Sequence, residues 1–259
     1  LVAGQVAGAG VDVYAKEPCT DSPLFTLDTV VATPHLGAST DEAQEKAGVA
    51  VAKSVRQALA GELVPDAVNV EGGNIEEPVR PFIELTERIG RIASTLAPSP
   101  IAAVDVQVLG EAASADVRVL QLSALKGVFS VLVEDPVSYV NAPVLAADRG
   151  VETSLSTDGE SPEHRTLVRV KLALTDGRSV AVAGTVAGPR DTETLVEIDG
   201  FEIDVPISEH MAFYTYDDKP GIVGVVGQIL GSADVNIAGM QVSRTKAGGE
   251  ALIALTVDS

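Results

Sequence analysis

Two alternating apolar runs joined by a two-residue turn limit the folds open to this chain more than any other feature. In the segment 165–186, apolar and polar residues alternate on both sides of Asp176-Gly177. A period of two places every second side chain on the same face of a strand, and Asp-Gly is a preferred hairpin turn. The segment therefore predicts an antiparallel β-hairpin with one buried face.

The first sixty residues show the pattern of an α/β protein. Apolar runs at 10–13 and 29–35 predict buried parallel strands, and the second run is β-branched. Ser39 followed three residues later by Glu42 has the spacing of a capping box, and apolar residues then recur every four positions. This pattern predicts a helix of roughly twenty residues that ends before a glycine.

Farther along the chain, the segment 82–96 predicts a helix, 102–110 a strand, and 116–130 a strand leading into a helix. From Ile207 onward, a strand, a Lys-Pro-Gly turn, a helix at 222–232 and two further strands follow. This β-α-β-β order is two thirds of a ferredoxin-like unit.

Composition shifts divide the chain. The stretch before residue 78 is rich in Gly, Pro, Asn and acidic residues, which predicts a boundary at Gly72 or Gly73. With the change of pattern at Ile207, the expected parts are 1–72, 73–206 and 207–259. Because the chain does not begin with Met and the last helix and strand of the ferredoxin-like unit are missing, both ends are expected to be truncated.

Charge and cysteine content exclude several functions. The chain has 37 acidic and 18 basic side chains, a formal net charge of −19, which repels nucleic acid and anionic membranes. No apolar run approaches the roughly 18 residues of a membrane span. A single cysteine, Cys19, cannot form an internal disulfide, and only three His are present, so no metal site is expected. These features predict a cytoplasmic protein.

Glu17 and His35 are the candidate catalytic pair. His35 follows an apolar run and a proline, where α/β proteins place ligands outside the carboxyl ends of strands. An imidazole can take a hydroxyl proton near neutral pH, and a carboxylate on its other nitrogen fixes the tautomer and raises its pKa. The alternative is a hydrogen-bonded loop histidine without chemistry.

These residues lie in motifs that resemble a known family. The segments "AGVDVYAKEP" and "VVATPHLGASTDEAQ" resemble the nucleotide-binding domain of the NAD-dependent D-2-hydroxyacid dehydrogenases, and most closely its phosphoglycerate dehydrogenases. The resemblance implies that Glu17 and His35 are the acid and base partners. It also implies that Asp12, near the nicotinamide carboxamide, binds NAD together with His35 and Gly37. Asp12 could instead simply end a strand.

The rest of the chain resembles the regulatory region of the long phosphoglycerate dehydrogenases. Residues 73–206 resemble their intervening domain, and 207–259 resemble an ACT domain. The expected fold is therefore α/β and α+β multidomain: a Rossmann-type remnant, an α+β intervening domain and an incomplete ferredoxin-like ACT domain. The ACT resemblance implies an L-serine site at Asp218, Asn236 and Tyr216, where the helix after the turn favours a carboxylate. The alternative is that these residues serve turn geometry.

Two function hypotheses follow. The resemblance implies an oxidoreductase that converts D-3-phosphoglycerate with NAD, is regulated by L-serine and forms a homo-oligomer, expected to be a tetramer. The alternative is a regulatory and oligomerising module without catalysis. The glycines between Gly4 and Gly10 precede a strand and lack the G-x-G-x-x-G spacing, so they are not read as a phosphate loop. The chain alone is therefore expected to be inactive.

Overall fold

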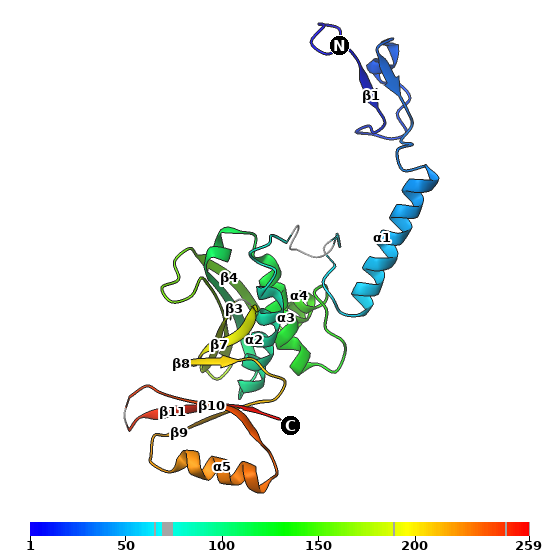
Figure 1. Cartoon of the computed structure of the whole chain (residues 1–259). Helices are drawn as coiled ribbons and strands as arrows, with labels where there is room; N and C mark the ends of the chain where they lie inside the picture. Colours follow the sequence, from blue (N-terminus) through cyan, green and yellow to red (C-terminus); the bar gives the residue numbers. More distant parts are fainter. Residues whose placement is uncertain (65, 69–74, 189, 247, 259) are drawn as a thin grey trace. The chain divides into compact units, whose positions relative to one another are not determined.

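The computed structural model describes residues 1–64, 66–68, 75–188, 190–246 and 248–258 (Figure 1). Two compact units make up the chain, Leu1–Ala60 and Gly61–Ser259. The boundary predicted at Gly72 or Gly73 lies outside the described residues.

In the first unit, two short parallel strands precede a long helix. Strand β1 (Ala9–Val11) pairs with β2 (Val30–Ala32), and a 3-10 turn, η1 (Pro23–Thr26), lies between them in the chain. Helix α1 (Asp41–Leu59) follows. Both predicted strands and the predicted helix are confirmed, although the strands are shorter than the apolar runs that predicted them. The predicted burial of these strands is wrong, because none of their residues is buried within this unit.

The residue that caps α1 differs from the prediction. The side chain of Thr40, rather than that of Ser39, accepts the hydrogen bond from the Ala43 amide at 3.2 Å. Ser39 and Thr40 are adjacent hydroxyl residues, and either can cap a helix. The backbone decides between them, because the helix begins at Asp41 and the capping residue must immediately precede it.

The second unit contains two β-sheets and four α-helices in its described part. Its elements in chain order are α2 (Phe82–Leu96), β3 (Ile101–Gly110), η2 (Glu111–Ser114), α3 (Arg118–Leu132), α4 (Ala142–Asp148), β4 (Glu152–Asp158), β5 (Thr166–Leu174), β6 (Ser179–Ala187), β7 (Thr192–Ile198), β8 (Phe201–Pro206), β9 (Met211–Asp217), α5 (Ile222–Ser232), β10 (Ile237–Arg244) and β11 (Glu250–Val257).

A six-stranded mixed sheet forms the centre of this unit, in the order β4-β3-β5-β6-β7-β8. Strands β5 and β6 pair in antiparallel register, with Leu172 opposite Val180, which confirms the predicted hairpin. Only β3 and β4 run parallel within this sheet. The apolar faces of these strands and of the helices α2 and α3 form the main core.

Helices α2 and α3 pack against each other unusually closely because each has a glycine at the contact. A Cβ atom on Gly127 would lie 2.0 Å from the Glu87 carbonyl oxygen, and one on Gly90 would lie 2.5 Å from that of Ala124. The segment 116–130 does not begin with the predicted strand, because α3 is helical from Arg118 onward. An apolar helix buried on most sides gives the same short-range pattern as a strand.

The C-terminal part confirms the β-α-β-β order. Strand β11 pairs antiparallel with both β9 and β10, so β9 and β10 run parallel on either side of it, as in a split β-α-β unit. No residue of the connecting helix α5 is buried. Among all described residues, no helix is both long and apolar enough to cross a membrane.

Candidate active site

The structure brings Glu17 and His35 together. Nδ1 of His35 lies 2.8 Å from Oε2 of Glu17, and the two side chains are 52% and 34% exposed. The other carboxylate oxygen of Glu17 accepts a hydrogen bond from the Tyr14 amide at 2.9 Å. The carboxylate is therefore held at both oxygens, which sets the plane of the imidazole ring.

Asp12 fixes the loop that carries His35. It directly follows β1, and its two carboxylate oxygens accept hydrogen bonds from the amides of Leu36, at 2.7 Å, and Gly37, at 2.8 Å. The hydroxyl of Thr33, the residue after β2, also donates to Asp12. These contacts surround His35, whose φ of +61° is uncommon for a residue with a side chain.

Hydrogen bonds set the protonation of this site. The hydrogen bond and charge of Glu17 raise the pKa of His35 above 6.5. The pKa of Glu17 is lowered, first by His35 and then by the Tyr14 amide. Bonds from Thr33, Leu36 and Gly37 likewise lower the pKa of Asp12. The pair therefore favours a carboxylate next to an imidazolium.

A pocket of about 400 Å³ adjoins the pair. Its walls include Glu17 and His35 together with the aromatic rings of Tyr14 and Phe25, which meet edge to face at 5.7 Å, and the thiol of Cys19. It opens beside the carboxyl ends of the two parallel strands, the usual position of ligands in α/β proteins. The residues present thus fit the reactive end of a nicotinamide and its substrate.

Sequence patterns missed two supports of this pair. Thr33 donates to Asp12, which lies 21 residues away in the sequence, and the Tyr14 amide donates to Glu17, which lies three residues away. A Thr at the end of an apolar run has no distinctive pattern. Gly4 and Gly8 precede β1, as predicted, and Gly10 lies within that strand. No group of three or more potential metal ligands is found in the part of the chain that the structure describes.

The three residues expected to bind L-serine do not converge within one chain. Asp217, next to Asp218, pairs with Glu250 at the start of β11, whereas Asn236 adjoins Ile237, which pairs with Val257 at its end. These two positions are roughly 23 Å apart, at about 3.3 Å for each strand residue.

Each of these side chains has local partners instead. Asp218 pairs with Arg244 at 3.3 Å and accepts from the Gly248 amide at 3.2 Å. Asn236 donates to Asp258 at 2.8 Å, and the Tyr216 ring stacks on Tyr214 with 6.2 Å between ring centroids. The strand pairing therefore separates groups that lie only 18 positions apart in sequence.

Comparison with known proteins gives a consistent result. Residues 1–37 match the family model of the D-isomer specific 2-hydroxyacid dehydrogenase NAD-binding domain. Residues 78–199 match that of the D-3-phosphoglycerate dehydrogenase intervening domain. A protein named D-3-phosphoglycerate dehydrogenase from Mycobacterium leprae is 49% identical over 98% of this chain and 48% of its own length. The protein of that name from Synechocystis is 36% identical over 98% of this chain and 46% of its own length. The one from Methanocaldococcus jannaschii is 32% identical over 100% of this chain and 49% of its own length. The chain is thus similar to proteins named D-3-phosphoglycerate dehydrogenase over 98–100% of its own length.

The chain spans about half the length of these D-3-phosphoglycerate dehydrogenases. All four residues of the predicted catalytic and cofactor site, Asp12, Glu17, His35 and Gly37, lie within the segment that matches the NAD-binding domain. The segment with the closely packed helices α2 and α3 lies within the match to the intervening domain.

Proposed function

We propose that this chain supplies the proton-transferring pair of an NAD-dependent D-3-phosphoglycerate dehydrogenase. The reaction oxidises D-3-phosphoglycerate to 3-phosphohydroxypyruvate, the first step of L-serine biosynthesis. The 2.8 Å contact between Glu17 and His35 carries the proposal, because it lies within the segment that matches the NAD-binding domain. The proposed setting is a cytoplasmic homo-oligomer, a tetramer.

In this proposal each residue has its own task. Glu17 occupies Nδ1 of His35, so Nε2 is the nitrogen that takes the proton from the substrate hydroxyl. The carboxylate stabilises the imidazolium that forms. Bound NAD would supply the acceptor for the hydride on the carbon that carries this hydroxyl. Asp12 holds the Leu36 and Gly37 amides and thereby keeps His35 at the rim of the pocket.

A chimeric enzyme tests this proposal. The chain replaces the matching half of the Mycobacterium leprae protein, to which it is 49% identical, and phosphoglycerate-dependent NADH formation is measured. We expect His35→Ala to lower kcat by about 10²–10⁴, the usual contribution of a general base. Because oxidation requires neutral His35, the rate should rise with pH through its pKa, and Glu17→Gln should move that rise to lower pH.

Glu42→Gln is the matched control, because Glu42 pairs only with Lys46 on the exposed side of α1. It should leave both the rate and the pH profile unchanged. An unaltered kcat in the His35→Ala chimera would remove His35 from the mechanism.

The second candidate function is regulation by L-serine at an ACT-like module. Asp218 and Asn236 lie at opposite ends of β11, so they can face one ligand only when two chains pair. We propose such a paired site, with Asp218 receiving the ammonium group of serine and Asn236 of the second chain offering its amide. Tyr216 lies beside Asp218 on β9.

Calorimetry tests the serine site. Millimolar L-serine should release heat with the intact chain, and Asp218→Asn should weaken this binding. The affinity should fall when the protein is diluted below the dissociation constant of the paired chains, because the site needs two chains. Absence of heat from a folded, associated chain would contradict a sensing role.

A further inference from the structure

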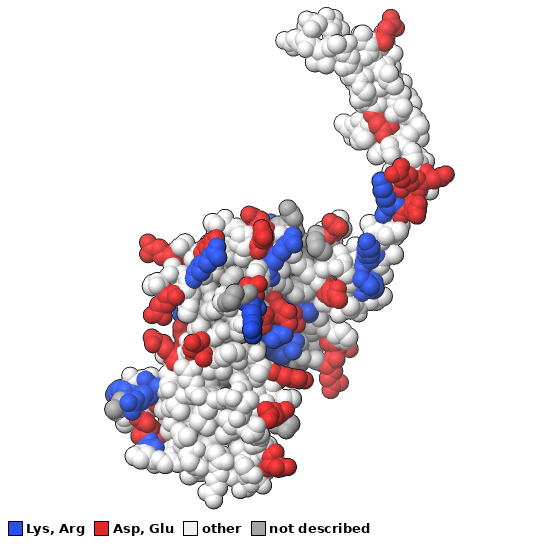
Figure 2. Space-filling view, viewed as in Figure 1, with Lys and Arg blue, Asp and Glu red and all other residues white. Residues whose placement is uncertain are grey.

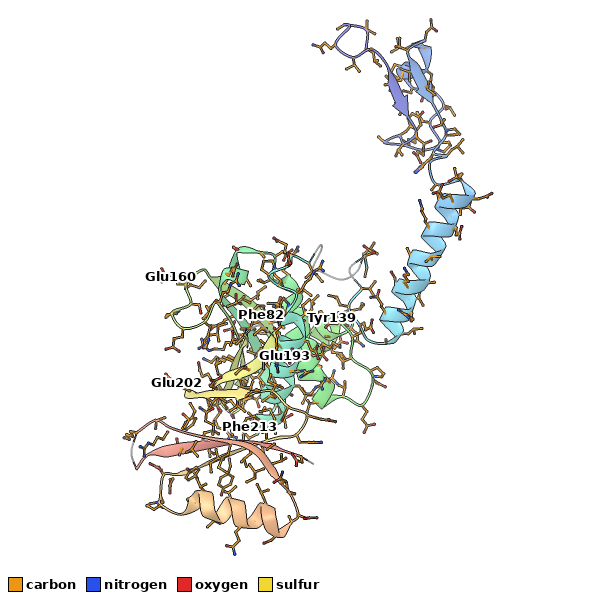
Figure 3. The ribbon with its side chains drawn as sticks, viewed as in Figure 1. Phe82, Tyr139, Glu160, Glu193, Glu202 and Phe213 are labelled. Atoms are coloured by element: carbon orange, nitrogen blue, oxygen red, sulfur yellow. The ribbon has the colours of Figure 1, made fainter. Side chains whose placement is uncertain are left out.

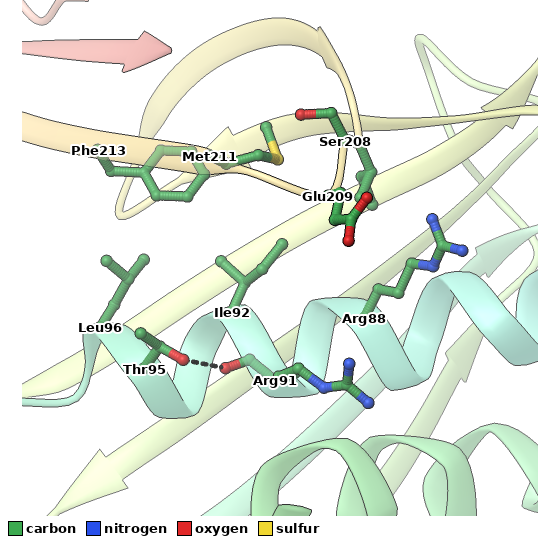
Figure 4. Close-up of a pocket in the computed structure, with 10 residues that line it drawn as sticks. Arg88, Arg91, Ile92, Thr95, Leu96, Ser208, Glu209, Met211 and Phe213 are labelled. Atoms are coloured by element: carbon green, nitrogen blue, oxygen red, sulfur yellow. Dashed lines mark hydrogen bonds between the residues drawn. The ribbon is translucent and has the colours of Figure 1, made fainter. Parts of the chain in front are cut away.

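A cleft of about 520 Å³ separates α2 from the segment that leads into β9 (Figure 4). Five α2 residues line it: Arg88, Arg91, Ile92, Thr95 and Leu96. Their spacing of three and four places them on one side of the helix. Leu85 and Ile89, which continue the Ile92–Leu96 stripe toward the start of α2, are fully buried in the core. The cleft is therefore a surface feature of a firmly held helix.

One wall of this cleft is apolar. Ile92 and Leu96 face Met211 and Phe213 across it, and all four side chains are partly buried against the core. Pockets that bind small molecules are commonly lined this way, with a few polar groups that set the ligand's orientation. A branched or aromatic ligand side chain would cover this wall.

The other part of the cleft carries both signs of charge. Arg88 pairs with Glu84 and, at 3.2 Å, with Glu193, and Arg91 pairs with Glu87 at 3.2 Å. A guanidinium has five N–H donors, so both arginines keep donors for a carboxylate.

Glu209 supplies the negative charge. Its carboxylate has no hydrogen bond or ion pair with any residue in the described part of the chain, and it points from the linker toward the α2 side of the cleft (Figure 4). A simple anion would be repelled by Glu209, and a simple cation would leave the remaining N–H donors of the two arginines unused. A ligand that carries both a positive and a negative charge can pair with Glu209 and with the arginines at the same time.

We propose that this cleft binds an α-amino acid with a large apolar side chain. Its carboxylate pairs with Arg91 and Arg88, its ammonium group pairs with Glu209, and its side chain covers Ile92, Leu96 and Phe213. The cleft contains neither Asp218 nor Asn236. It is therefore distinct from the serine site proposed above and independent of it.

Calorimetry on the intact chain with L-leucine, L-methionine and L-phenylalanine provides the first test. We expect saturable heat at millimolar ligand. Isocaproate, which lacks the ammonium group of leucine, and isoamylamine, which lacks its carboxylate, should each bind at least about tenfold more weakly. One charge-assisted hydrogen bond contributes this much.

Glu209→Gln is the decisive variant, since the side chain is exposed and its loss should not disturb folding. Leucine should then bind about tenfold more weakly, to the level of isocaproate, while isocaproate itself should not weaken. Thr95→Trp, on the exposed side of α2, should fill the cleft and abolish binding.

Glu160→Gln is the matched control, because it removes the same charge from an exposed loop distant from Phe213 (Figure 3). It should leave the leucine affinity unchanged. The proposal is overturned if folded chain gives no heat with any of the three amino acids, or if isocaproate binds as tightly as leucine. Heat that persists in Glu209→Gln but is lost in Asp218→Asn would place the ligand at the other site and would equally overturn it.

Discussion

Residues 1–60 and residues 61–259 hold their structures by different means. No residue of the first unit is buried, and Val31, in the middle of β2, is 71% exposed. Its geometry depends on the carboxylates of Asp12 and Glu17, which bind neighbouring amides and His35. The second unit instead buries a continuous apolar core. Hydrogen bonds therefore position the candidate site in the first unit, whereas close packing of apolar side chains holds the second unit together.

The distribution of charged side chains on the second unit also differs from that of a surface that binds a polyanion. Figure 2 shows acidic and basic side chains interspersed over its visible face rather than gathered into one patch. Several acidic and basic side chains pair within one element, and Arg169 on β5 pairs with Glu197 on β7 at 2.6 Å, across the intervening strand β6. The excess of acidic residues is thus spread over the surface.

The largest expected effect tests packing in the second unit. Gly127→Ala places a Cβ atom 2.0 Å from the backbone oxygen of Glu87, so α2 and α3 must move apart. We expect the free energy of unfolding to fall by about 3 kcal/mol. Urea-induced unfolding followed by circular dichroism measures this change.

Gly224→Ala serves as its control. Gly224 is an exposed residue in the first turn of α5, with nothing within 4 Å of an added Cβ. The same substitution there should stabilise the helix by about 0.5–1 kcal/mol. Equal effects at the two glycines would mean that α2 and α3 do not approach as closely as described.

A smaller effect is expected at the start of α1. Thr40→Ala removes the acceptor for the Ala43 amide and should destabilise the helix by about 1 kcal/mol. Ser39→Ala should have almost no effect, because Ser39 precedes the capping position. Hydrogen exchange of the Ala43 amide distinguishes the two variants. A larger effect from Ser39→Ala would restore the capping box predicted from the sequence.

The smallest change concerns protonation. Glu17→Gln should lower the pKa of His35 toward 6.5, because it removes the charge that favours imidazolium. NMR titration of the ring measures the shift, and Glu42→Gln should leave it unchanged. An unchanged His35 pKa in Glu17→Gln would break the claim that hydrogen bonds organise this unit.

The stability that the pair contributes depends on pH in a defined direction. Because the folded pKa of His35 is raised, its contribution is fully present below 6.5 and is lost as pH rises through that raised pKa. Because the pKa of Glu17 is lowered, its contribution is present above 4.5 and is lost as pH falls through that lowered pKa. The pair therefore stabilises this unit most between the two folded pKa values.

Much of the secondary structure was predictable because it follows from local spacing. The hairpin at Asp176-Gly177 and the helices at 82–96 and 222–232 formed as the apolar periodicity indicated. The segment 116–130 was misread at its start, because a buried helix is apolar on most sides and loses its periodicity.

The candidate site was predictable in part. Glu17 and His35 could be selected by residue type and resemblance, although they are 18 positions apart. The hydrogen bonds of Asp12 could not, because they depend on the parallel pairing that brings the ends of β1 and β2 together. Local pattern contains no information about which strand ends meet.

Spacing and residue chemistry in the chain were sufficient for most element types and for the turn residues, and together with the family resemblance they were sufficient for the acid–histidine pair. Strand pairing settled the rest, because the neighbours of a side chain depend on register over long separations. The antiparallel pairing of β11 places Asp218 and Asn236 at opposite ends of one sheet. The packing of α2 beside the start of β9 creates a charged cleft, which could not be predicted from any single segment of the sequence.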